Sequence, residues 1–183
     1  MYSQPRGLQL DRLKTPIGAA LLVTDEQGVL RALDFHDYES RMLRLLRRHY
    51  ASVPLAAGSA PSAVRAALTR YFFEGKFTAL AGIEWTAAGT PFQRSVWNAL
   101  LAIPPGETRS YGGVARLLGR SDAPRAVGWA IGSNPIAIVV PCHRVIGASG
   151  KLTGYASGLH RKHWLLQHEG SFSASRLQRA LAG

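Results

Sequence analysis

The first half of the chain alternates apolar runs with polar turns, which is typical of a mixed α/β domain. Residues 16–24 (PIGAALLVT) and 29–35 (VLRALDF) are separated by the turn sequence DEQG and together predict a β-hairpin. Apolar residues at helical spacing predict helices over residues 40–50 and 63–75, the second beginning after Ser62 as a cap. We therefore expect a mixed α/β fold for this half.

A breaker-rich segment separates this half from the next. Residues 76–85 are predicted to be extended, and residues 86–91 (TAAGTP) are small and rich in turn formers. Domain boundaries fall in such segments, so we place one near Ala88. The expected organisation is an N-terminal α/β domain with its linker over residues 1–88 and a second domain over residues 89–183.

The second half is predicted to be mostly helical. One amphipathic helix follows Pro91, and two short helices over residues 111–119 and 125–132 come after it. Ser110 and Asp122 are the expected caps of these two short helices. Two short helices joined by a tight turn are typical of a helix-turn-helix, although an αα-hairpin inside a core gives the same pattern.

The second short helix (PRAVGWAIG) has few side chains that could read bases. Arg125 is its one long polar side chain, whereas a major-groove reader needs several. Small residues such as Ala126 and Gly128 would let the backbone approach the narrow minor groove. A single arginine could then enter the base stack as a wedge.

The charge of the chain favours a polyanionic partner. The net charge is +11, and the surplus lies mostly in residues 91–183, which hold eleven basic and three acidic side chains. An acid-poor surface of this kind attracts nucleic acid. No apolar run is long enough to cross a bilayer, and the first residues hold no apolar signal core, so we expect no membrane association.

The chain has a single cysteine, Cys142, at the end of the apolar run Ile136–Val140, which predicts a strand. A lone thiol excludes an internal disulfide and suits the reducing cytoplasm. Pro141, His143 and Arg144 flank it, and a nearby imidazole or guanidinium favours the reactive thiolate. Because neighbours on a strand face opposite sides, His143 can act on Cys142 only if the backbone bends or a water relays the proton.

Glu169 stands in the last turn of a predicted helix that ends at Gly170. A carboxylate there opposes the helix dipole, at a cost of roughly 0.3–1 kcal/mol. A role in holding His143 in one tautomer would explain its position, as in catalytic triads.

Three segments of the second half carry a family resemblance. They are residues 89–119 (GTPFQRSVWNALLAIPPGETRSYGGVARLLG), 124–135 (PRAVGWAIGSNP) and 134–170, which contains PCHRVIGASGKLTGYASG. They resemble the O6-alkylguanine-DNA alkyltransferases, also called methylated-DNA–protein-cysteine methyltransferases. The first half fits that family's variable domain more loosely. The resemblance implies a ribonuclease H-like N-terminal domain and a winged-helix-like helix-turn-helix domain that carries the active-site cysteine.

The resemblance also implies a function, which is DNA repair by direct reversal of damage. The alkyl group on O6 of a guanine flipped out of duplex DNA would pass to Cys142 and stay there as a thioether. Each molecule would therefore act once, as a methylated-DNA–protein-cysteine S-methyltransferase. The implied partner is double-stranded DNA containing O6-alkylguanine, bound through its minor groove by a monomer located in the cytoplasm and on the nucleoid. Clustering of several molecules on DNA is left open.

By the same resemblance, five residues would perform the chemistry. Cys142 is the nucleophile, His143 takes the thiol proton through a water, and Glu169 orients His143. Asn134 braces the turn between the recognition helix and the cysteine. Tyr111 donates a proton or hydrogen bond to the purine as the base leaves.

Other positions would bind the extruded base and its duplex. Arg125 fills the gap that the base leaves. The carbonyls of Cys142 and Val145 accept from the exocyclic amine of guanine, which distinguishes it from adenine. Tyr155 and the backbone N–H of Ala156 line the loop side of the pocket.

The chain departs from the family pattern at three points, one of which is Ala156 in place of a serine found in some relatives. Trp129 lies in the recognition helix where a small residue is expected, and because a large ring would obstruct close approach to DNA, we expect it to face the core. The zinc site of some members needs N-terminal cysteines, which this chain lacks. We therefore expect no metal and no cofactor.

Three other functions are compatible with parts of the sequence. The first is a non-catalytic alkyl-lesion-binding protein on the same scaffold. The second is a cysteine hydrolase that pairs Cys142 with the distant His160 or His163. The third is a helix-turn-helix regulator, against which the single polar side chain of the second helix argues. The role of residues 171–183 is left unassigned.

Overall fold

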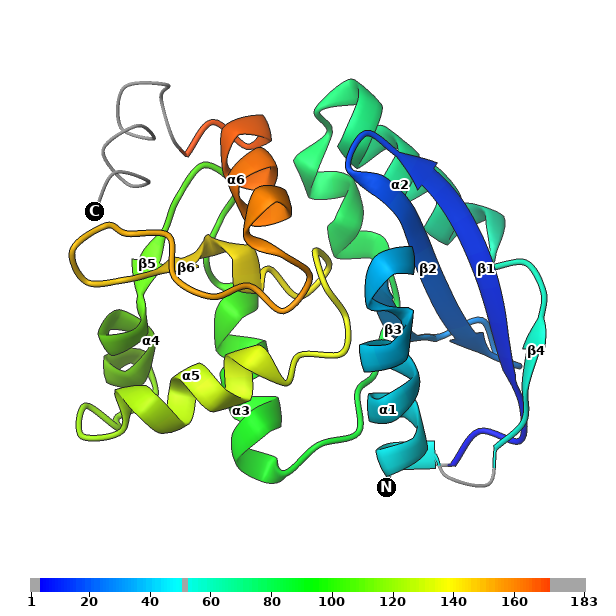
Figure 1. The fold of residues 1–183 in the computed structure, drawn as a ribbon, viewed down its shortest axis with the longest axis horizontal. Coiled ribbons are helices and arrows are strands. Elements are labelled where there is room, and N and C mark those ends of the chain that lie inside the picture. The colour runs from blue at the N-terminus through cyan, green and yellow to red at the C-terminus, as the bar shows by residue number, and fades with distance from the viewer. Residues whose placement is uncertain (1–3, 51–52, 172–183) are drawn as a thin grey trace. The chain divides into compact units, whose positions relative to one another are not determined.

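The computed structural model describes residues 4–50 and 53–171 (Figure 1). The chain divides into two units by its internal contacts. One unit holds the chain up to Ala88 together with Pro135–Val139, and the other holds Gly89–Asn134 and the chain from Val140 onward.

The first unit is built on a four-stranded sheet with the order β3-β2-β1-β4. Its strands are β1 (Leu8–Thr15), β2 (Gly18–Asp25), β3 (Leu30–Phe35) and β4 (Leu55–Ala57). β2 pairs antiparallel with both β1 and β3, and β4 pairs parallel with β1. The predicted hairpin is confirmed as β2 and β3, whereas β1 and β4 were not predicted.

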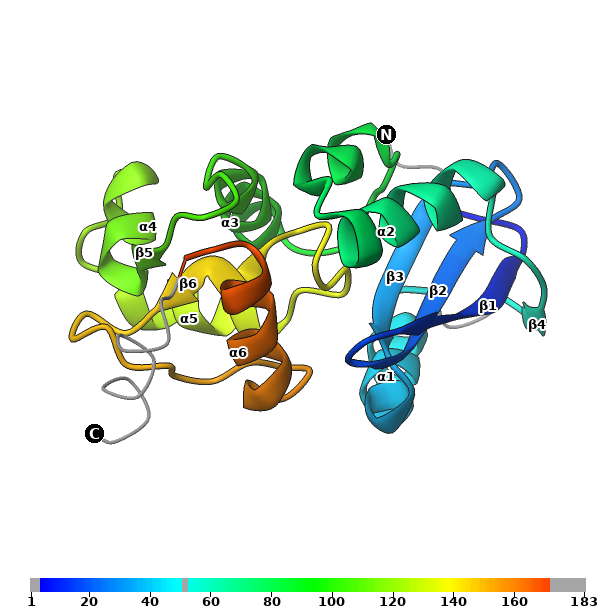
Figure 2. The same ribbon diagram turned by 90° about the horizontal axis from the view of Figure 1, so that it is seen from above.

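Helices lie on both faces of this sheet, α1 (Glu39–Tyr50) on one and α2 (Ser62–Glu74) on the other (Figure 2). α1 buries Met42 and Leu46 against Leu21 and Val23 of β2. Alternate residues of a strand point to opposite faces, so β2 and β3, which are buried along most of their length, need cover on both sides. This double cover explains why their sequences read as continuous apolar runs.

Two details of the first unit differ from expectation. α2 begins at Ser62 itself, and its N-cap is Pro61, which makes no side-chain cap bond. Residues Phe77–Gly82 form a 3₁₀ helix instead of extended chain. The 3₁₀ turns place Leu80 in the core, so the prediction of extended chain is wrong for these residues.

The predicted strand over Ile136–Val140 is wrong. A single bridge joins Ile136 to Leu33 of β3, and Ile138 has a φ of 71°. A left-handed residue turns the chain away from a ladder, and β-branched residues seldom adopt it. The side chains of this segment are all buried, so its apolar composition reflects burial and not strand pairing.

Up to residue 171, the second unit packs four helices around a short two-stranded parallel sheet. The helices are α3 (Pro91–Leu101), α4 (Tyr111–Leu117), α5 (Pro124–Gly132) and α6 (Leu159–His168), and the strands are β5 (Arg109–Ser110) and β6 (Val145–Ile146). Val96 and Leu100 of α3 and Ile103 just beyond it are fully buried. Trp97 Nε1 donates to the carbonyl of Ala130 at 2.9 Å and ties α3 to α5.

Local signals fix where these helices begin. Thr90 and Gln93 form a reciprocal capping box at the start of α3. The Ser110 side chain caps α4, as predicted, by accepting from Gly113 N. The predicted cap at Asp122 is wrong, because Ala123 is the N-cap of α5 and the exposed Asp122 pairs with Arg120 at 3.7 Å. Across the described part of the chain, no helix is long and apolar enough to span a bilayer.

Candidate active site around Cys142

Cys142 opens a 3₁₀ turn, Cys142–Arg144, in the second unit. Cys142 is 4% exposed, so its sulfur is shielded from bulk water. The sequence left open how His143 could act on Cys142 when the two residues are adjacent, and the tight turn explains it. Because the backbone bends at Cys142, the side chain of His143 is not forced to the opposite side as it would be on a strand.

Asn134, just after α5, contacts the sulfur directly. Its Nδ2 donates to Cys142 Sγ at 3.1 Å and to the carbonyl of Val140 at 3.0 Å, and the residue is 2% exposed. The bond to Val140 fixes the chain that leads into the turn. The bond to sulfur favours the thiolate, because an N–H donor stabilises the charged form of its acceptor.

Glu169, the C-cap of α6, lies at the centre of a buried polar cluster beside Cys142. Its Oε1 lies 3.0 Å from His143 Nε2, and Arg144 donates to both carboxylate oxygens at 2.8 and 2.9 Å. Arg144 also donates from Nη1 to the carbonyl of Ile103 at 2.6 Å. The carboxylate has a fixed function here, which explains why a Glu is found at a helix C-terminus.

The charge states in this cluster follow from burial and pairing. Burial alone would raise the pKa of Glu169, but His143 and Arg144 hold it far below its usual range. Burial lowers the pKa of His143, which is fully buried. An ionised carboxylate only accepts, so His143 carries its proton on Nε2. Nδ1 is then the basic nitrogen, and it has no hydrogen-bond partner among the described residues.

Lys162 of α6 is a component of the site that sequence reasoning missed. It is completely buried, and its Nζ donates to the carbonyls of Val145, Thr153 and Gly154. Burial lowers its pKa to about 8, a shift that the nearby Cys142 opposes. Helical spacing could have predicted the burial of Lys162, because it lies three residues before the buried Leu165 on the same face of the helix.

Tyr155 borders the cluster, and Tyr111 lies beside the loop residue Thr153. The Tyr155 ring meets the His143 ring edge to face, with centroids 6.5 Å apart. Tyr111 begins α4, and its hydroxyl is 3.4 Å from Thr153 Oγ1. A Cβ built on Gly128 would lie 3.6 Å from the Tyr111 ring, so α5 passes close to this tyrosine.

The two carbonyls expected to recognise guanine each already accept one bond. Val145 N donates to the carbonyl of Cys142, and Lys162 Nζ donates to that of Val145. A carbonyl has two lone pairs, so each retains acceptor capacity. Ala156 is half-buried in the loop between Gly154 and Ser157.

The remaining predicted residues lie on α5 outside the buried cluster. Arg125 and Ala126 are exposed, and Gly128 is half-buried. The expectation that Trp129 faces the core is wrong, because it is 83% exposed. The buried face of α5 is formed by Val127, Ala130 and Ile131, and Trp129 falls on the opposite side of the helix.

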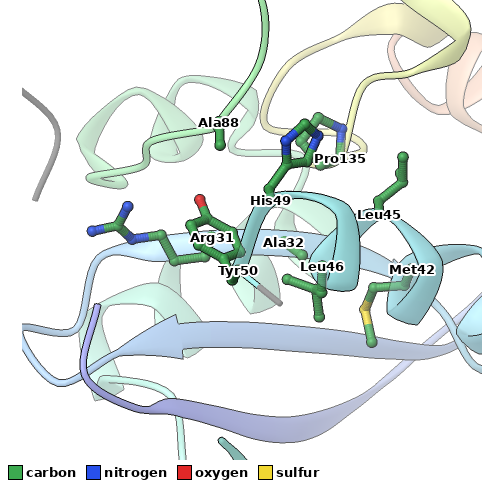
Figure 3. Close-up of a pocket in the computed structure, with 9 residues that line it drawn as sticks. All are labelled: Arg31, Ala32, Met42, Leu45, Leu46, His49, Tyr50, Ala88 and Pro135. Carbon is green, nitrogen blue, oxygen red and sulfur yellow. The ribbon is translucent and has the colours of Figure 1, made fainter. Parts of the chain in front are cut away.

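The apolar pocket of the first unit is not part of this site. It lies beside α1, and Figure 3 shows the side chains around it. Its lining consists of Arg31, Ala32, Met42, Leu45, Leu46, His49, Tyr50, Ala88 and Pro135. None of these is a nucleophile paired with a base, so the reactive group of the chain remains Cys142.

A family model and known proteins both match this chain. Residues 91–171 match the family model of the 6-O-methylguanine DNA methyltransferase DNA binding domain. The methylated-DNA–protein-cysteine methyltransferase of Salmonella typhimurium is 49% identical over 162 residues, which cover 87% of this chain and 94% of that protein. The one of Methanosarcina acetivorans is 45% identical, over 86% of this chain and 96% of that protein.

Solved structures extend the likeness to both units. The crystal structure of Mycobacterium tuberculosis O6-methylguanine methyltransferase is 40% identical with a TM-score of 0.71, covering 94% of this chain and 98% of that one. Mycobacterium tuberculosis OGT in complex with DNA gives 40% identity and a TM-score of 0.72, covering 93% and 97%.

Replacing Glu169 with Gln tests the central pairing. The change leaves the buried Arg144 without its counter-charge, so the free energy of unfolding should fall by about 3–5 kcal/mol. Urea unfolding at neutral pH measures this. Glu107→Gln removes the same charge from an exposed acid of the second unit and should cost less than about 0.5 kcal/mol. Equal effects of the two substitutions would contradict the central role of Glu169.

Lys162 should make stability depend on alkaline pH. Its pKa is about 8 in the folded protein against an ordinary value of 10.5, so between these values the unfolded chain binds a proton that the folded one does not. The contribution of Lys162 to the free energy of unfolding therefore rises as pH rises from about 8 to about 10.5. Lys162→Met should remove that rise, as urea unfolding across this range can show. Lys76→Met, on an exposed lysine, is the control and should keep the wild-type profile.

Proposed function

The chain belongs to the methylated-DNA–protein-cysteine methyltransferase family, and on this premise we propose that it repairs DNA by moving an alkyl group from O6 of guanine onto Cys142. The enzyme class is that of its relatives, at up to 49% identity. The observation that carries the proposal is the shielded sulfur of Cys142, which accepts from Asn134 beside a His143 whose free ring nitrogen is basic.

The transfer is a displacement at carbon. The Cys142 thiol proton passes through a water to Nδ1 of His143, and the sulfur attacks the alkyl carbon. The bond between that carbon and O6 breaks, and its electron pair stays on the guanine. Tyr111 donates to the purine as negative charge develops there, and the proton that neutralises the guanine balances the one that His143 took from the thiol. The new thioether has no route of cleavage here, so each molecule acts once.

The polar cluster prepares the sulfur for this step. Glu169 accepts the Nε2 proton of His143 and so keeps the lone pair on Nδ1. Arg144 holds the carboxylate in place with two hydrogen bonds. Lys162 adds a buried positive charge near the sulfur, which favours the thiolate. The near absence of solvent limits competing hydration of the nucleophile.

The burial of the sulfur supports base flipping. A cysteine that is 4% exposed cannot reach an atom inside a base stack, so the guanine must leave the duplex. We infer that α5 lies in the minor groove, where Ala126 and Gly128 allow close approach and Arg125 fills the gap. The carbonyls of Cys142 and Val145 accept from the exocyclic amine of the extruded base.

The loop side of the pocket completes the binding site in this proposal. Tyr155 borders it next to His143, and the N–H of Ala156 faces O6. The fold is proposed to comprise a ribonuclease H-like domain over residues 1–88 and a winged-helix-like domain over residues 89–183. The protein would act as a monomer in the cytoplasm and on the nucleoid, as a lone thiol and a basic second half favour.

The other functions gain less support. A hydrolase would pair Cys142 with His160 or His163, but Glu169 orients His143 and His160 is exposed. A sequence-reading regulator needs several polar side chains on α5, where Arg125 is the one long example. A non-catalytic lesion binder would not need the Asn134 bond to sulfur.

Cys142→Ala should abolish alkyl transfer and preserve DNA binding, because it removes the nucleophile and little else. The measurement is intact mass after mixing with duplex DNA that contains O6-methylguanine. Wild-type protein should gain one methyl group per molecule, with the modified residue located by peptide mapping. Wild-type protein that binds the lesion and gains no mass would establish the non-catalytic binder instead.

Arg125→Ala should slow repair of duplex DNA more than reaction with a free O6-alkylguanine base, since only the duplex requires a wedge. Flipping costs a few kcal/mol, and each 1.4 kcal/mol is tenfold, so a loss of about tenfold or more on duplex is expected. Single-turnover rates on the two substrates measure the split. Equal losses on both would exclude the wedge role.

A further inference from the structure

Trp129 is the most exposed large hydrophobic residue that the structure describes, at 83%. A single exposed apolar side chain is common on proteins and implies nothing by itself. Its position is what matters. It stands on α5, one helical turn after Arg125, where the rest of the exposed face carries small residues.

The periodicity of α5 places Trp129 and Arg125 on one stripe. Val127, Ala130 and Ile131 are buried and define the inner face of the helix. Residues four apart lie on the same face, so the indole and the guanidinium point away from the core together. Four residues of helix rise about 6 Å, which is close to two base-pair steps of about 3.4 Å.

The charge around this stripe indicates what covers it. Three arginines are exposed here: Arg116 on α4, Arg120 in the turn and Arg125 on α5. The same region exposes one acid, Asp122. A second copy of this chain would bring a like-charged surface against it. Duplex DNA complements the charge, and its minor groove, about 6 Å wide, admits a flat ring edge-on. Proteins that bind this groove commonly insert apolar side chains there.

We propose that Trp129 is a second minor-groove contact, which places its indole in the groove about two base pairs from the point where Arg125 enters. This inference rests on the proposed function, because it assumes that α5 faces duplex DNA. It goes further because it assigns part of the DNA affinity to a residue that takes no part in alkyl transfer. This part comes from an apolar contact and does not depend on salt.

The test is binding of Trp129→Ala to a short duplex, by fluorescence anisotropy over a range of salt concentrations. We expect affinity to fall about tenfold, while the slope against salt stays unchanged because no phosphate contact is lost. Reaction with a free O6-alkylguanine base should keep its wild-type rate. The side chain is exposed, so the thermal midpoint should stay unchanged. Trp129→Phe, which keeps an aromatic ring, should recover part of the affinity.

Phe73→Ala provides the matched control. Phe73 is an exposed aromatic residue of α2 in the first unit, at 61%, and its loss should not alter DNA affinity.

A second readout is tryptophan fluorescence. The emission of Trp129 is the difference between the spectra of the wild-type protein and of Trp129→Phe. This difference spectrum should shift to the blue when duplex is added, as expected for an indole that leaves water.

Three results would overturn the inference. Unchanged affinity of Trp129→Ala would show that the indole makes no contact with DNA. Higher affinity would show that it obstructs binding. A loss of self-association in sedimentation, with DNA affinity intact, would assign the stripe to a second copy. Wild-type protein that transfers no alkyl group but still binds DNA through Trp129 would refute the proposed function alone.

Discussion

The ionised carboxylate of Glu169 is the interaction on which the rest of the site depends. It is buried at the end of α6, where Arg144 holds both of its oxygens and His143 donates to one of them. Arg144 continues to the carbonyl of Ile103, just beyond α3. One charged group thus joins two helices to the turn that carries Cys142. A buried charge is tolerated only when it is paired and hydrogen-bonded, so losing one partner would strand the others.

A second buried charge acts on the loop that follows the cysteine. The Lys162 ammonium donates to three carbonyls, that of Val145 in β6 and those of the neighbours Thr153 and Gly154 further along the loop. It therefore closes the loop and places a cation near Cys142 with the same three bonds. Structure and reactivity are coupled here, because the group that orders the loop is also one that favours a thiolate.

Periodicity predicted most helices and the β2–β3 hairpin because those elements are selected by burial on a regular face. It failed where a tertiary contact decides the backbone. Ile138 adopts a left-handed conformation inside an apolar run, which no local pattern reveals. β1 carries charged residues in mid-strand, and Asp11 is stabilised there by Arg65 of α2, a partner 54 residues away. Likewise α5 begins at Pro124 without the side-chain cap that Asp122 could have supplied.

The residues of the site also differ in whether the sequence could predict them. Cys142, His143 and Glu169 could be named from the sequence and the family resemblance, whereas the role of Lys162 follows only from the three-dimensional loop to which it binds. Trp129 is the instructive error. The spacing of Val127, Ala130 and Ile131 already placed residue 129 on the outer face. We expected Trp129 to face the core because the family pattern has a small residue at this position. The structure instead agrees with the spacing, since Trp129 is exposed. Where helical periodicity and a family pattern disagree, the periodicity reflects the packing of this chain itself and is the better guide to which face of the helix a residue occupies.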